Sequence, residues 1–236
     1  AFIRYTRPGC SIIVVPVEGG AEQRIGECGD NFMGDLAWSP DGRALLYSDR
    51  SETGRPYGLW RLTLDLQAVQ PLTDPGDGYL GDTDPAFSPD GRLVAFIRRT
   101  SMSVQDIYVV PAGGGAARRL TFREGLVEGL AWTPDGRHVL FAGSEGENHA
   151  LWQVPLDGGA VARARLGNTG MRNPSFAQRA GLLAGEQWSF DMNIWHLALD
   201  EPDRPTGLPK SLIASTRKDH MPDEAPDGRV AFASNR

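Results

Sequence analysis

A five-residue motif, Pro-Asp-Gly-Arg preceded by Ser, Thr or Ala, recurs along the chain and constrains its fold more than any other feature. Intact copies begin at Ser39, Ser88, Thr133 and Ala225, and a degenerate copy occupies 177–181. Successive copies are therefore spaced by 49, 45, 44 and 48 residues. A period in the mid-forties is the length of one four-stranded blade of a β-propeller.

The motif has the composition of a tight turn between two strands. Proline presets φ at the first central position, aspartate can accept hydrogen bonds from its own backbone, and glycine accepts a positive φ. Short apolar runs flank the first copy at 36–38 and 44–47, and the later copies have similar flanks. Two apolar runs joined by Pro-Asp-Gly are typical of a β-hairpin.

The period predicts an all-β chain, a β-propeller of four-stranded antiparallel blades with about five repeats present. Ala1-Phe2-Ile3-Arg4 matches Ala231-Phe232-Ala233-Ser234, so both ends carry the same second strand. We therefore expect an excerpt of a larger, six- to eight-bladed propeller. We assign 1–236 to a single domain with blade repeats at approximately 1–30 (partial), 31–78, 79–124, 125–168, 169–218 and 219–236 (partial).

Composition and motifs argue against several classes of function. The 236 residues carry a net charge of −6, which gives no support to a nucleic-acid surface. No apolar run approaches the ~20 residues of a membrane span. The chain has no G-x-S-x-G nucleophile elbow, and its four histidines lack metal-ligand spacing. We predict no catalysis, no cofactor and no metal, with neither nucleic-acid contact nor a membrane span in this segment.

Cys10 and Cys28 are the only cysteines, and each lies nine residues from Gly19. If the hairpin turns at Gly19, the two thiols face each other across neighbouring strands. A disulfide can then form in an oxidising compartment. Two unconnected, partly buried thiols are the alternative.

The propeller architecture predicts one polar constellation. The innermost strand of each blade lines the central channel, so residues at the start of these strands converge on one mouth. A convergent polar ring on a rigid scaffold is the default site for a small molecule, an ion or a peptide, and we expect a protein or small-molecule ligand there. The alternative is that these residues are polar only because the mouth is exposed to solvent. The predicted ring consists of Asp35, Asp84, Glu128, Asn173 and His220, with Arg172 beside them.

Two sets of sequence segments resemble known families. The box D-P-x-F-S-P-D-G-R-x-x-A-F at 84–96, followed by the segment 106–121, resembles the WD40-like repeat of TolB-type propellers. The segments 193–195, 212–217 and 231–236 are similar to the propeller of bacterial CadC-like winged-helix regulators. The second resemblance implies a sensory or protein-interaction module beyond a DNA-binding domain and, often, a transmembrane helix, both outside this segment.

Three functions follow from these resemblances. The first is a non-catalytic sensor or binding propeller of a bacterial transcriptional regulator. The second is the propeller of a prolyl-oligopeptidase-like serine peptidase, and the third is a TolB-like envelope scaffold. We expect a periplasmic location, as the soluble domain of a membrane-anchored protein, with a cytoplasmic one as the alternative. Fold alone does not choose among these functions.

Overall fold

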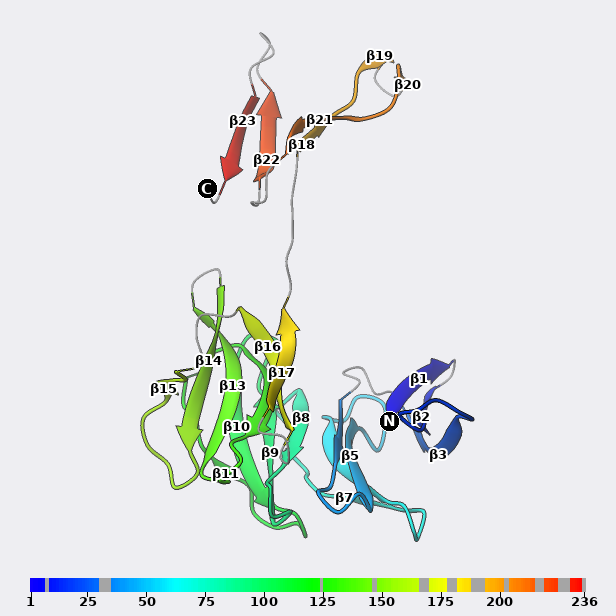
Figure 1. The fold of residues 1–236 in the computed structure, drawn as a ribbon, viewed down its shortest axis with the longest axis vertical. Helices are drawn as coiled ribbons and strands as arrows, with labels where there is room; N and C mark the ends of the chain where they lie inside the picture. The colour runs from blue at the N-terminus through cyan, green and yellow to red at the C-terminus, as the bar shows by residue number, and fades with distance from the viewer. Residues whose placement is uncertain are drawn as a thin grey trace. The chain divides into compact units, whose positions relative to one another are not determined.

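The computed structural model describes residues 1–6, 9–29, 35–123, 125–145, 148–165, 170–177, 182–187, 194–201, 204–214, 219–224 and 230–234. These residues form strands, turns and extended segments, with no helix among them, which confirms the predicted all-β class. The chain divides into two compact units, Ala1–Gln187 and Trp188–Arg236. Figure 1 labels most of the strands of both units by number.

The first unit consists of successive antiparallel sheets, each from one repeat (Figure 1). The second, third and fourth repeats form four-stranded sheets, in which neighbours in sequence pair with one another. The first repeat contributes three described strands and the fifth contributes two. The strands are β1 (Phe2–Thr6), β2 (Gly9–Val14) and β3 (Gln23–Cys28); β4 (Leu36–Trp38), β5 (Ala44–Asp49), β6 (Gly58–Thr63) and β7 (Ala68–Pro71); β8 (Gly81–Phe87), β9 (Leu93–Arg99), β10 (Gln105–Pro111) and β11 (Arg118–Arg119); β12 (Val127–Trp132), β13 (His138–Glu145), β14 (Asn148–Pro155) and β15 (Ala162–Arg163); and β16 (Met171–Ala177) with β17 (Leu182–Gln187).

The second unit contains three two-stranded pairs among its described residues. The degenerate motif copy at 177–181 and the last copy at 225–229 lie mostly outside the described residues. The division into units falls within the fifth predicted repeat, so a single domain over 1–236 stays a prediction. The pairs are β18 (Ile194–His196) with β21 (Lys210–Ile213), β19 (Leu199–Glu201) with β20 (Arg204–Pro205), and β22 (Asp219–Glu224) with β23 (Val230–Ser234).

The recurring motif forms the predicted hairpin turn between the first two strands of a blade. In the first copy, the Ser39 hydroxyl donates a hydrogen bond to Asp41 (2.6 Å) and accepts one from the Ala44 amide (2.9 Å). The Arg43 amide donates to the same Asp41 carboxylate, and Gly42 has a φ of 70°. Strands β4 and β5 then pair in register from Trp38 opposite Leu45. The copies at 88–93 and 133–138 repeat these bonds.

Alternation along each second strand distributes its side chains between two cores. Successive residues of a strand point to opposite faces of the sheet. Leu45 packs with Ile12 of the first blade, whereas Leu46 packs with Phe96 of the third. Further cores join the third blade to the fourth and the fourth to the strands of the fifth. Each described sheet of the first unit is therefore stabilised by burying its faces against its neighbours, as the repeat predicts.

Polar contacts also connect neighbouring blades. The indole Nε1 of Trp132, a residue that is 2% exposed, donates to the Ala86 carbonyl of the preceding blade at 2.9 Å. The guanidinium of Arg118 donates to the Leu156 carbonyl at 2.6 Å. Because a buried carbonyl without a partner costs about 1–3 kcal/mol, the bond from Trp132 favours one arrangement of adjacent blades, and the exposed bond from Arg118 contributes less.

In the first blade, a disulfide joins Cys10 to Cys28. The two residues are directly opposite each other on β2 and β3, and both are buried. Their side chains are part of the core that connects the first blade to the second. The crosslink therefore stabilises a sheet of only three described strands.

Candidate functional site at the channel mouth

A cavity of about 640 Å³ lies where the inner strands of four blades converge. Strands β4, β8, β12 and β16 each contribute a corresponding segment to its wall, and β17 adds one residue. The lining is apolar or aromatic at most positions, and its polar side chains are Asp35, Asp84, Ser88, Asn173, Ser175 and Glu186. The lining residues are 35–38, 40, 84–89, 129–132, 173–176 and 186.

A repeated β-bulge shapes the mouth of this cavity. In β8, β12 and β16 the pairing with the second strand shifts register shortly after the strand begins. One residue in each bulge has a positive φ: Asp84 (52°), Gly129 (70°) and Asn173 (44°). Left-handed backbone is uncommon for residues other than glycine, although Asp and Asn tolerate it best. The bulge therefore places one residue per blade at the same point on the cavity wall.

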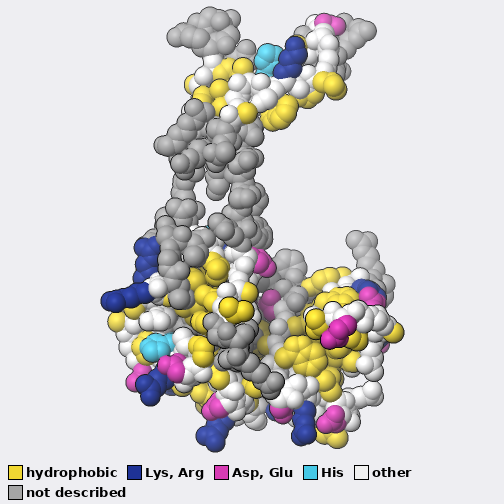
Figure 2. All heavy atoms as spheres, viewed as in Figure 1, with side chains coloured by type: hydrophobic (Ala, Val, Ile, Leu, Met, Phe, Trp, Pro, Cys, Tyr) yellow, Lys and Arg dark blue, Asp and Glu magenta, His cyan; other side chains and the backbone are white. Residues whose placement is uncertain are grey.

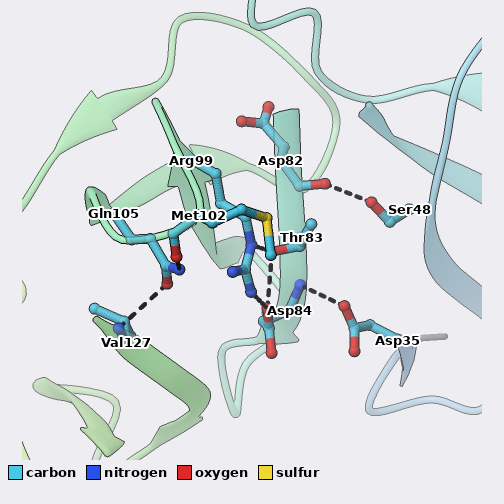
Figure 3. Close-up of polar contacts among 9 residues, drawn as sticks. All are labelled: Asp35, Ser48, Asp82, Thr83, Asp84, Arg99, Met102, Gln105 and Val127. Atoms are coloured by element: carbon cyan, nitrogen blue, oxygen red, sulfur yellow. Dashed lines mark hydrogen bonds and ion pairs between the residues drawn. The ribbon is translucent and has the colours of Figure 1, made fainter. Parts of the chain in front are cut away.

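Two carboxylates approach each other at one side of the mouth. Asp35 accepts a hydrogen bond from the Asp84 backbone amide at 3.2 Å, as Figure 3 shows. Burial, and then repulsion from Asp84, raise the pKa of Asp35 to about 7. The pKa of Tyr5 is raised as well, by partial burial and then by the negative charge of Asp35. Near neutral pH, Asp35 therefore exchanges between its protonated and charged forms.

The carboxylate of Asp84 has a cationic partner in the same blade. The Arg99 guanidinium lies 3.0 Å from Asp84 Oδ2 and donates a second hydrogen bond to the Thr83 hydroxyl at 2.8 Å (Figure 3). Both side chains of the ion pair are largely shielded from solvent. Arg99 itself does not line the cavity. The pair therefore fixes the orientation of Asp84 without contributing a positive charge to the wall.

The other side of the mouth carries Asn173 and Glu186. The Asn173 amide donates to Glu186 Oε2 at 3.0 Å, and both side chains are exposed. Glu186 lies opposite Arg172 in the β16–β17 register, one residue before the bulge. Sequence reasoning missed Glu186, although its position on the second strand of the fifth hairpin could have identified it as a candidate.

Glu128 and Arg172 do not line the cavity but pair with each other. Arg172 Nη1 lies 3.2 Å from Glu128 Oε1, and Arg172 Nη2 lies 3.2 Å from Nδ1 of His149. Because an arginine can only donate, Nδ1 of His149 is the acceptor, which leaves the proton on Nε2. That Nε2 lies 2.7 Å from Glu128 Oε2. His149 was missed in the sequence, where it is an isolated histidine.

The structure thus brings Asp35, Asp84 and Asn173 of the predicted ring to one cavity. Glu128 and Arg172 each precede a bulge residue, as Thr83 does, and lie beside the mouth rather than in its wall. The backbone of His220 belongs to β22 in the second unit, and its side chain lies outside the described residues. Whether the predicted ring as a whole binds a ligand stays a prediction.

Neither a metal site nor a membrane helix is found in the described part of the chain. No group of three or more His, Cys, Asp or Glu side chains there is arranged to hold a metal ion. No helix in the same residues is long and apolar enough to cross a bilayer. Basic and acidic side chains are interspersed on the face of the first unit in Figure 2.

Comparisons with known proteins agree with this architecture. Tol-Pal system protein TolB of Bordetella pertussis is 30% identical over 52% of this chain, and dipeptidyl-peptidase 5 of Porphyromonas gingivalis is 25% identical over 67%. The matches span only about a quarter of these relatives, 27% and 24% of their lengths. The crystal structure of TolB from Acinetobacter baumannii superposes with a TM-score of 0.65 at 19% identity, covering 97% of this chain and 56% of that one.

These comparisons do not support the predicted similarity to CadC-like regulators, because the relatives found are TolB and peptidase-like proteins. They also include a peptidase, so the absence of catalysis stays a prediction. The family description that matches the sequence is the TolB β-propeller domain, over residues 81–236. Together with the repeated four-stranded sheets, this match shows that the chain belongs to the TolB β-propeller family.

Proposed function

We propose that this chain is a non-catalytic binding module, a TolB-like propeller that holds a segment of a partner protein or a small molecule in its channel-mouth cavity. The observation that carries the proposal is the cavity itself. Its volume of about 640 Å³ is within the range of typical ligand pockets, and its wall combines apolar side chains with a few convergent polar groups.

A periplasmic location is part of this proposal. Disulfides persist in oxidising compartments, which for bacteria include the periplasm. The Cys10–Cys28 crosslink is compatible with such a compartment, and a relative is a Tol-Pal system protein.

Photocrosslinking tests the binding role whatever the identity of the guest. Benzoylphenylalanine replaces Ser175, an exposed residue of the cavity wall, and in a control replaces Leu66, which is 75% exposed in an outer turn. In cells of the source organism we expect a discrete adduct from position 175 and none of that mass from position 66. No adduct from position 175, or the same adducts from both positions, would refute a guest in the cavity.

A peptidase propeller is the second candidate, because the chain resembles dipeptidyl-peptidase 5 over 170 residues. In that case the propeller belongs to a larger enzyme, and the reading frame continues into a hydrolase domain. Sequencing the flanking frame distinguishes the two, since a G-x-S-x-G elbow with later Asp and His residues indicates the peptidase. A winged-helix segment upstream would instead support the sensor of a transcriptional regulator, with the same binding role for the propeller.

A further inference from the structure

The charges in the cavity wall are of one sign. Asp35, Asp84 and Glu186 line it, and no Lys, Arg or His is among its lining residues in the described part of the chain. Arg99 compensates Asp84 from behind the wall at 3.0 Å. Asp35, which directly precedes β4, and Glu186, on β17, add two further carboxylates to the wall.

Most of the remaining lining residues are apolar, with Ser88, Asn173 and Ser175 as neutral polar exceptions, and the apolar ones include an accessible indole ring. Trp38 lines the cavity and is 40% exposed, whereas Trp132, at the equivalent position two blades later, is 2% exposed. An exposed indole face attracts cations as well as apolar groups. A neutral apolar guest would exclude water from the carboxylates without supplying a compensating charge, which is unfavourable. An anionic guest would be repelled by them.

We propose that the guest of this cavity is an organic cation, a guanidinium or alkylammonium group attached to an apolar chain. The inference rests on the proposed function and specifies the chemistry of the guest. The cationic group lies between Asp35 and Glu186, and the apolar part contacts Trp38 and the walls contributed by β8 and β12. A basic side chain of a partner protein and a free amine share this chemistry.

Asp35 couples binding to pH. The titratable and charged groups that face it are Tyr5 on β1, Asp84 on β8 and Arg99 on β9. A bound cation stabilises the charged form of Asp35 and so displaces its proton. Because the pKa of the free site is about 7, affinity for a cation increases as the pH rises from 6 to 8.

Calorimetry with a charged peptide and its neutral isostere tests the proposal. The probes are acetyl-Leu-Arg-Leu-amide and the same peptide with citrulline in place of arginine, with butylguanidinium as a free cation. We expect the arginine peptide to bind at least tenfold more tightly than the citrulline peptide. Butylguanidinium binding as tightly as the peptide indicates a small-molecule guest, and tighter peptide binding indicates a partner segment. Equal binding of the two peptides, or no binding of either, overturns the cationic guest.

Single substitutions test whether the preference for the arginine peptide depends on the carboxylates of the wall. Asp35→Asn and Glu186→Gln each remove one wall charge, and we expect each to reduce the arginine-to-citrulline preference at least threefold. Asp65→Asn makes the same charge change at an exposed residue away from the cavity and leaves the preference unchanged. Preference retained in both cavity variants, or an affinity that does not change between pH 6 and 8, contradicts the assignment.

The photocrosslinking result separates this inference from the proposed function. A specific adduct at position 175 together with equal affinity for the two peptides means that the cavity binds a guest that is not cationic. If there is no adduct at position 175 and neither peptide binds, the binding role itself is wrong. The adduct therefore tests the proposed function, and the difference between the two peptides tests the cationic guest.

Discussion

Replacing Trp132 with phenylalanine should destabilise the first unit far more than the same change at Trp38. Both tryptophans directly precede a motif copy, so their backbone positions are equivalent. Trp132 is 2% exposed and bonds to the Ala86 carbonyl at 2.9 Å, whereas Trp38 is 40% exposed. The comparison therefore isolates the contribution of packing between blades from that of the residue type.

The magnitude follows from two losses at Trp132. The hydrogen bond to Ala86 contributes about 1 kcal/mol net. Shortening the ring leaves a void of roughly 40 Å³, which costs about 1 kcal/mol at the usual slope for residual cavities. We expect a free energy of unfolding lower by about 2 kcal/mol for W132F, a factor of roughly 30 in the unfolding equilibrium. For W38F we expect less than about 1 kcal/mol.

Hydrogen exchange at the amides of β8 and β12 is the appropriate assay, because it reports on these strands regardless of how the second unit unfolds. Urea denaturation followed by circular dichroism gives an independent estimate of the change. Equal destabilisation by W38F and W132F would refute the reasoning that the indole of Trp132 connects two blades. A loss below about 0.5 kcal/mol for W132F would refute it as well.

Two further predictions concern ionisation and crosslinking. Because the folded pKa of Asp35 is raised, the native state holds a proton that the unfolded chain loses near pH 4, so Asp35 lowers stability as the pH rises from about 4 to 7. Asp35→Asn should therefore raise the free energy of unfolding in urea at pH 8, by about 1–3 kcal/mol, and leave it unchanged at pH 4; a gain of equal size at both values would contradict this. Replacing Cys10 and Cys28 with serine opens a crosslink between residues 18 apart in sequence and should cost about 3 kcal/mol. Thermal unfolding with and without dithiothreitol checks this, since reductant should lower the melting temperature of the wild type alone, and a reductant effect on the double variant would count against the interpretation.

The hairpins could be predicted from the sequence because their information is local. Pro, Asp and Gly at fixed places determine the turn, and the same hydroxyl-to-carboxylate bond forms at Ser39, Ser88 and Thr133. The runs that follow the turns are continuously apolar, which is typical of strands buried on both faces. Repetition reinforced the assignment, since each copy supported the others.

The composition of the site was harder to predict, because it depends on a change of register. The predicted ring selected one polar residue near the start of each inner strand. At the bulge, adjacent residues of the inner strand have different surroundings. Asp84 lines the cavity and is equivalent to Gly129. Glu128, one position before Gly129, pairs with Arg172 instead. Side chains alternate between faces with a period of two, so an error of one residue changes the surroundings completely. No turn motif marks the bulge in the sequence.

The two ends of the inner strand have different roles in this repeat. At its far end the motif is intact in four of the five copies, and its bonds are the same in three described blades. At the bulge, the left-handed position holds Asp84, Gly129 and Asn173 in the first unit. At Gly129 a Cβ atom would lie 2.5 Å from the Asn173 Cα, so close approach of the two backbones requires glycine there. The other two positions accommodate side chains and direct them to the mouth. The repeat thus fixes the scaffold at one end, and the residue that each blade places at the bulge determines what the cavity can bind.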